Sequence, residues 1–181
     1  MLLEPADIVF TDTGLWTSRL IKWGTQEAGE APTLVSHVAL AVDNSKVVEA
    51  LGRGVVKRSL YKAYMGKKVA VYRCKSHVIS KTDKIRVAAY AEELQDSVVR
   101  YSYLGILIRM VDALLGKLKI KSRLASYYKP TNFSECEQFV TKCFSDRGVF
   151  FGKALSPDDL WDYIISNPDD FLCIKPLGEL Y

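Results

Sequence analysis

The chain contains the stretch SHVALAVDNSKVVEAL at residues 36–51. Two apolar, β-branched runs flank the polar triplet DNS at residues 43–45, a pattern that is typical of a β-hairpin. Apolar runs at residues 7–11, 54–60 and 68–74 predict further short strands around this hairpin. We therefore expect an antiparallel sheet that is built from the first half of the chain.

The hairpin can bring an imidazole and a carboxylate together. If residues 43–45 form a three-residue loop, His37 and Glu49 lie on the same face of the sheet as diagonal neighbours. If the loop has two residues, the two side chains point to opposite faces. The pattern therefore permits a His–Glu pair without requiring one, and a strand histidine taken alone is more often structural.

The second half of the chain is predicted to be helical. Sequence patterns predict helices at residues 81–96, 103–115 and about 135–144. A last helix is expected to begin at the N-cap Ser156 and to end before Asn167. Because the strands come first and the helices mostly follow, the expected fold class is α+β.

Length and composition favour one globular domain. The chain has 181 residues, of which 49% are hydrophobic and 25% charged, which is enough apolar material for a core. We expect a single domain over residues 1–181, with a helical segment around residues 80–130 between the strands and the cysteine helix. The net charge of +4 is mild and lacks the dense Lys/Arg clusters of a nucleic-acid-binding surface, so no nucleic-acid partner is expected.

Targeting signals and metal-binding spacings are not found in the sequence. The N-terminal residues lack the basic and apolar regions of a signal peptide, and the most apolar segment is too short to span a bilayer. We expect a cytoplasmic protein, and delivery as a secreted effector remains an alternative. The cysteines and histidines lack zinc-ligand spacing, so we expect no metal or cofactor and four free thiols.

Cys136 lies in the sequence SECEQFV at residues 134–140. Ser134 and Glu137 match an S-x-x-E capping box, which would place Cys136 in the first turn of a helix. There, unpaired backbone N–H groups and the helix dipole favour the thiolate. The competing interpretation is that Cys136 packs on the apolar helix face, and the flanking Glu135 and Glu137 disfavour a thiolate. We expect the remaining cysteines to be packing residues: Cys74, Cys143 and Cys173.

A thiol at a helix start, a histidine on a strand and a third polar group are the parts of a cysteine-hydrolase site. The chain has only two histidines, and His77 falls in a predicted connector, where a surface position is expected. His37 is therefore the candidate base for Cys136, and Glu49 is the candidate orienting residue. The order His, Glu, Cys reverses the usual papain-like order.

A basic segment lies between the predicted helices. It carries Lys117, Lys119, Lys121 and Arg123, with Leu118 and Ile120 interleaved. The simplest interpretation is a solvated face. Contact with a membrane surface is the alternative, because apolar residues alternate with the basic ones.

The ordered set of motifs resembles the permuted NlpC-type papain-like hydrolases of the YiiX/YebB kind, which are related to the lecithin retinol acyltransferase group. The matching pieces cover nearly the whole chain: residues 6–10, 15–23, 36–40, 48–50, 54–56, 101–107, 136–140 and 156–160. The resemblance implies a circularly permuted papain-like fold, with an antiparallel half-barrel sheet packed on helices.

The resemblance also implies roles for individual residues. Cys136 would be the nucleophile, His37 the base and Glu49 the orienting residue. Tyr101 or Tyr103 would contact the oxyanion or the substrate. Family members often have Ser or Ala after the cysteine, whereas this chain has Glu137.

The expected function is cysteine-dependent hydrolysis of an amide or ester through a thioester acyl-enzyme. The substrate class stays open among small molecules, peptides and lipids, and no oligomeric state is predicted. One alternative is an acyltransferase that acts on lipid-like substrates. The relation to the lecithin retinol acyltransferase group and the basic segment favour this alternative. Another is a non-catalytic binding domain on the same fold, which Glu137 favours.

Overall fold

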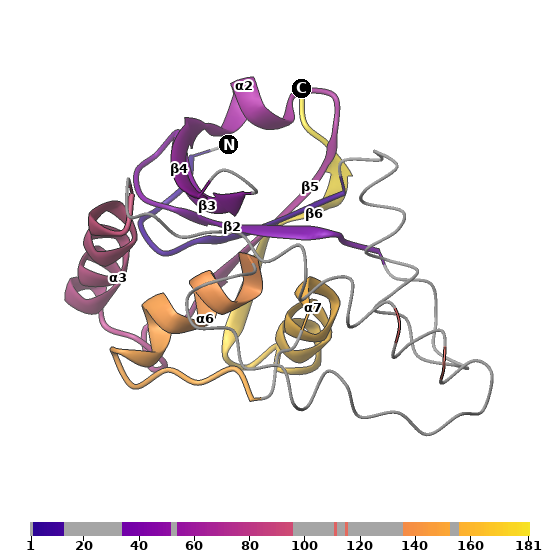
Figure 1. Ribbon diagram of the computed structural model, residues 1–181. Helices are drawn as coiled ribbons and strands as arrows, with labels where there is room; N and C mark the ends of the chain where they lie inside the picture. Colours follow the sequence, from indigo (N-terminus) through magenta and orange to yellow (C-terminus); the bar gives the residue numbers. More distant parts are fainter. Residues whose placement is uncertain are drawn as a thin grey trace.

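The computed structural model describes residues 2–12, 34–51, 54–95, 111, 115, 136–152 and 156–181. Within these residues the fold is mixed α/β, with an open six-stranded antiparallel sheet in the order β4-β3-β2-β1-β5-β6 (Figure 1). The strands are β1 (Ile8–Asp12), β2 (His37–Ala41), β3 (Lys46–Leu51), β4 (Gly54–Ser59), β5 (Lys68–Cys74) and β6 (Phe171–Glu179). The described helices are α2 (Leu60–Tyr64), α3 (Lys81–Glu93), α6 (Cys136–Ser145) and α7 (Pro157–Ser166).

The β2–β3 hairpin has the register of a three-residue loop, as one of the two sequence alternatives predicted. Leu40 pairs with Val48, and the Val42 amide donates to the Lys46 carbonyl at 3.0 Å. Asp43 supports the loop, because its Oδ1 accepts two backbone N–H groups at 2.8 Å each. An Asp side chain that bonds the backbone just ahead of it favours such a turn.

The two faces of the sheet pack against different helices. Figure 1 shows α6 and α7 on one side of the sheet and α2 on the other. The α6 face buries one set of alternating strand residues: Ile8, Phe10, Val38, Leu40 and Val48. The α2 face buries the other set together with helix residues: Val9, Ala39, Ala41, Val47, Leu60 and Tyr64. The period-2 alternation of the strands therefore separates two cores, and both bury apolar surface.

Two predicted helix starts are confirmed. The Ser80 hydroxyl accepts from the Asp83 amide at 3.1 Å, and Ser156 accepts from the Asp159 amide at the same distance. Pro157 begins α7, where its fixed φ suits the first turn and its missing N–H costs no helical hydrogen bond. These caps fix where α3 and α7 begin.

Two elements were not predicted. The five-residue helix α2 follows β4, and β6 forms an edge of the sheet beside β5. β6 gives little periodic signal, because its burial does not alternate and its pairing with β5 contains register shifts. The prediction that Cys173 is a packing residue is wrong, because Cys173 lies on this edge strand and is exposed.

Several predictions fall outside the described residues. They concern the helix at 103–115 as a whole, the basic residues Lys117, Lys119, Lys121 and Arg123, and the tyrosines Tyr101 and Tyr103. Among the helices of the described ranges, none has both the length and the apolar character needed to cross a bilayer.

Candidate active site

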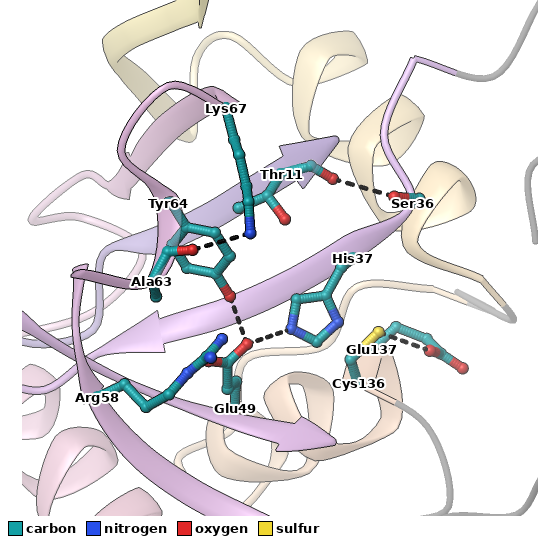
Figure 2. Close-up of polar contacts among 10 residues, drawn as sticks. All are labelled: Thr11, Ser36, His37, Glu49, Arg58, Ala63, Tyr64, Lys67, Cys136 and Glu137. Atoms are coloured by element: carbon teal, nitrogen blue, oxygen red, sulfur yellow. Dashed lines mark hydrogen bonds and ion pairs between the residues drawn. The ribbon is translucent and has the colours of Figure 1, made fainter. Parts of the chain in front are cut away.

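Glu49 and His37 form a close pair. His37 Nε2 lies 2.6 Å from Glu49 Oε2, the distance of a strong charge-assisted hydrogen bond (Figure 2). Glu49 is completely buried, and the His37 side chain is 13% exposed. The hairpin register explains the pair, since it places both side chains on one face of the sheet as diagonal neighbours.

The carboxylate of Glu49 accepts from two further side chains. Arg58 Nε donates to Oε1 at 2.5 Å, and the Tyr64 hydroxyl donates to Oε2. Burial alone would raise the pKa of Glu49. The hydrogen bond and charge of His37 and the hydrogen bonds of Tyr64 and Arg58 outweigh burial and lower this pKa to about 2. Glu49 is therefore a fixed negative charge at neutral pH.

Arg58 and Tyr64 were missed at the level of sequence. Glu49 pairs with Val56 across the β3–β4 hairpin, so Arg58 is its diagonal neighbour on the same face. Extending the strand pairing from β3 to β4 would have found Arg58. Tyr64 gives no such signal, because it comes from the short helix α2. The Arg58 guanidinium also lies 5.6 Å from the centre of the Tyr64 ring, a cation–π distance.

Cys136 is the first residue of α6 and is buried. Figure 2 shows the His37 ring between Glu49 and Cys136, with Nε2 toward the carboxylate and the other ring nitrogen on the side of the sulfur. Burial alone would lower the pKa of His37. Charge and hydrogen-bond interactions with Cys136, followed by those with Glu49, outweigh burial and raise this pKa to about 10. The imidazole is therefore protonated at neutral pH.

The geometry of β2 lets one imidazole contact groups from both sides of the sheet. His37 is the first residue of β2 and pairs with Thr11 of β1. On the β3 side, the described ladder pairs residues 40 and 41 with 48 and 47, and so stops short of His37. The ring thus lies at the end of the strand, where it contacts Glu49 on the α2 face and Cys136 from the helix on the opposite face.

Glu137 is the second carboxylate of the site. It is 1% exposed, and the Cys136 sulfur lies 3.8 Å from its Oε2, with the thiol as the donor. In Figure 2 the Glu137 side chain lies on the side of the sulfur away from His37. The sequence indicated Glu137 as a capping residue and as a carboxylate near the thiol, and the structure adds a direct contact between the two side chains.

The other titratable candidates lie in different environments. Cys74 and Cys143 are buried, and burial raises the pKa of each to about 12. His77 is exposed and pairs with Asp170 at 3.1 Å, so its predicted surface position is confirmed. Ser134, Tyr101 and Tyr103 lie outside the described residues, and their predicted roles stay predictions.

The fold is similar to that of a solved structure. The crystal structure of metalloprotein YiiX from Escherichia coli O157:H7 matches with a TM-score of 0.52 at 15% sequence identity. The match covers 100% of this chain and 98% of that chain. The sequence itself matches no protein-family profile and no curated protein. The chain therefore has a YiiX-like fold.

Proposed function

We propose that this chain is a permuted papain-like cysteine hydrolase that cleaves an amide or ester bond through a thioester acyl-enzyme. One observation carries the proposal: the His37 imidazole is held by a buried carboxylate on one side and faces the Cys136 sulfur on the other (Figure 2). A nucleophile, a base and a group that orients the base are the parts that such a reaction needs.

The proposed reaction has two halves. The Cys136 thiolate attacks the carbonyl carbon, and backbone N–H groups at the start of α6 stabilise the oxyanion. The His37 imidazolium then donates its proton to the leaving amine or alcohol. In the second half, His37 takes a proton from water as the water attacks the thioester, and Cys136 leaves as the thiolate. Glu49 keeps the ring oriented and stabilises its charged form throughout.

A metal is not part of this proposal. The similar structure is described as a metalloprotein. In the described ranges, no three His, Cys, Asp or Glu side chains gather as ligands. The oxygens of Glu49 already accept from Arg58, Tyr64 and His37. The described residues around Glu49 therefore do not fit a metal centre, and the proposed reaction uses none.

Trapping the acyl-enzyme tests the proposal. The protein is mixed with a panel of nitrophenyl esters and anilides, quenched with acid, and mapped by peptide mass spectrometry. We expect an acyl group on Cys136 in the wild-type protein and none in Cys136→Ala. Acylation of other residues only, or of none across the panel, would contradict the proposal and favour a non-catalytic binding domain. If the acyl group passes from Cys136 to an added alcohol or amine in preference to water, the enzyme is an acyltransferase.

A further inference from the structure

The carboxylate of Glu49 is shared among three donors. His37 Nε2 and the Tyr64 hydroxyl both contact Oε2, whereas Arg58 Nε donates to Oε1 at 2.5 Å (Figure 2). His37 therefore shares its oxygen with Tyr64, and Arg58 holds the other oxygen. Because both oxygens are engaged, the carboxylate is fixed in its orientation toward the imidazole.

Both of the other donors keep their protons at neutral pH. The Tyr64 side chain is 1% exposed, and burial, followed by the charge of Glu49, raises its pKa well above the ordinary value. Arg58 carries a permanent charge. Its guanidinium lies 5.6 Å from the centre of the Tyr64 ring, so the two donors also contact each other.

The charge of Glu49 has two opposite effects in the proposed reaction. It helps to keep the His37 ring protonated, and the pKa of the ring is raised to about 10. The same stabilisation makes the ring a weaker acid in the step that protonates the leaving group, because a general acid works best when its pKa lies near the working pH. The site therefore needs a carboxylate that orients the ring without holding its proton too tightly.

Tyr64 and Arg58 can meet this need through their hydrogen bonds to the carboxylate. When His37 gives up its proton, Glu49 stays charged and loses its cationic partner. A buried carboxylate in that state is costly unless other groups donate to it. Two donors that remain in place stabilise this state and so favour release of the proton.

We infer that Tyr64 and Arg58 are positioning residues that act on His37 through Glu49, holding the carboxylate against the imidazole and easing the release of the ring proton. The inference rests on the proposed function, because it concerns the step in which His37 protonates the leaving group.

Several elements contribute charged or titratable groups around the His37–Glu49 pair. Among the described residues these groups are Arg58 of β4, Tyr64 of α2 with Lys67 beside its ring, and Cys136 of α6 with Glu137 next to the sulfur. The variants below change only the groups that donate to Glu49 and leave the Cys136 side of the ring intact.

Four substitutions separate charge, hydrogen bonding and shape. Tyr64→Phe removes the hydroxyl and keeps the ring, and Arg58→Gln removes the positive charge. Arg58→Lys keeps that charge. Lys57→Gln is the matched control, because it removes a positive charge from the neighbouring residue of β4, whose side chain pairs with Glu92.

An NMR titration of the histidine rings gives the decisive readout, with His77 as the internal reference. We expect the His37 midpoint to rise by about 0.5 pH units or more in Tyr64→Phe and in Arg58→Gln. Arg58→Lys and Lys57→Gln should titrate close to the wild type. The rise is opposite to the fall expected when Glu49 itself is neutralised, so simple loosening of the pair cannot produce it.

A comparison of two reactions at Cys136 links the titration to the proposed mechanism. Acylation by a substrate that acylates the wild-type protein should slow by about twofold or more in Tyr64→Phe and Arg58→Gln, because the ring is a weaker acid. Alkylation by iodoacetamide needs the thiolate but no proton from His37, so its rate should not fall. Cys74 and Cys143 are buried and should stay unmodified, which checks that each variant is folded.

Failure of this inference differs from failure of the proposed function. A His37 midpoint that stays unchanged or falls in Tyr64→Phe or in Arg58→Gln would overturn the role of that residue and leave the proposed function standing. Equal slowing of acylation and alkylation would show a merely structural role and would also overturn the inference. If the wild-type protein forms no acyl group on Cys136, the proposed function is overturned, even where the midpoints move as expected.

Discussion

At the scale of single residues, the site depends on one buried carboxylate. Glu49 is completely buried and remains charged because His37, Arg58 and Tyr64 all donate to it. An isolated buried carboxylate would be strongly unfavourable, whereas one with several charge-assisted donors is stable. Each donor is in turn oriented by the carboxylate. In the proposed mechanism, Glu49 is therefore a positioning residue that acts on the reaction through His37.

The first prediction concerns Glu49→Gln. The amide keeps the size of the side chain but cannot stabilise the imidazolium, so the pKa of His37 should fall from about 10. Turnover should decrease, but by less than the loss on the order of a thousandfold expected for Cys136→Ala or His37→Ala. An NMR titration of the ring and kcat measurements on the three variants check both parts. Wild-type turnover and an unchanged His37 pKa in Glu49→Gln would remove the orienting role.

The second prediction concerns the pH dependence of stability. The pKa of His37 is about 10 in the folded protein against 6.5 ordinarily, so the folded state binds the proton more tightly. The stabilisation is complete below pH 6.5 and is lost as the pH rises toward 10. For Glu49 the pKa is about 2 against 4.5, so its contribution is complete above pH 4.5 and is lost as the pH falls toward 2.

Urea unfolding at a series of pH values checks these signs. Between pH 6.5 and 10, the free energy of unfolding should fall more steeply in the wild-type protein than in His37→Ala. His77→Ala is the matched control and should follow the wild-type curve. Parallel curves for wild type and His37→Ala would mean that the proton on His37 is not held by the folded site.

At the scale of elements, the β2–β3 hairpin brings the His–Glu pair together. A three-residue loop places His37 and Glu49 on the same face, and a slip by one residue would send one of them to the other face. Asp43 helps to hold this loop through two backbone hydrogen bonds. The register of one short loop therefore controls the geometry of the site.

The third prediction is that Asp43→Ala destabilises the protein by about 1 kcal/mol or more, because the backbone donors of the loop lose their acceptor. The exposed neighbour Asn44 provides the control, and Asn44→Ala should change stability by no more than about 0.5 kcal/mol. Chemical denaturation of both variants gives the comparison. Equal stability of Asp43→Ala and wild type would show that the loop is held by other contacts.

The same element scale explains what could be predicted from the sequence. His37 and Glu49 were found because strand periodicity and loop length determine which side chains share a face. Finding Arg58 required one more step, the extension of the strand pairing from β3 to β4. Tyr64 and β6 gave no usable pattern, because α2 is only five residues long and the burial of β6 does not alternate. The Glu137–Cys136 contact depends on side-chain conformation at the helix start, which spacing does not fix.

At the scale of the whole molecule, the site joins the two cores of the sheet. α6 packs on the face that buries Val38 and Leu40, whereas Glu49 and Tyr64 belong to the face beneath α2. His37, at the end of β2, contacts Cys136 from the α6 side and Glu49 on the α2 face. The proposed nucleophile and the proposed base therefore come from separate layers and separate parts of the chain, so neither local motif could define the site alone. Membrane contact through the basic segment that begins at Lys117 stays a prediction.

The measurement that tests the central claim most directly is the rate at which iodoacetamide alkylates each of the four cysteines near neutral pH. We expect Cys136, although buried, to be labelled ahead of the exposed Cys173, because the protonated His37 beside it favours the thiolate. It should be labelled well ahead of Cys74 and Cys143, because burial raises the pKa of each of these to about 12. His37→Ala should slow the labelling of Cys136 by about tenfold or more, since loss of the imidazolium removes the partner of the thiolate. His77→Ala should leave it unchanged. Labelling of Cys136 no faster than Cys173, or unchanged by His37→Ala, would contradict the account.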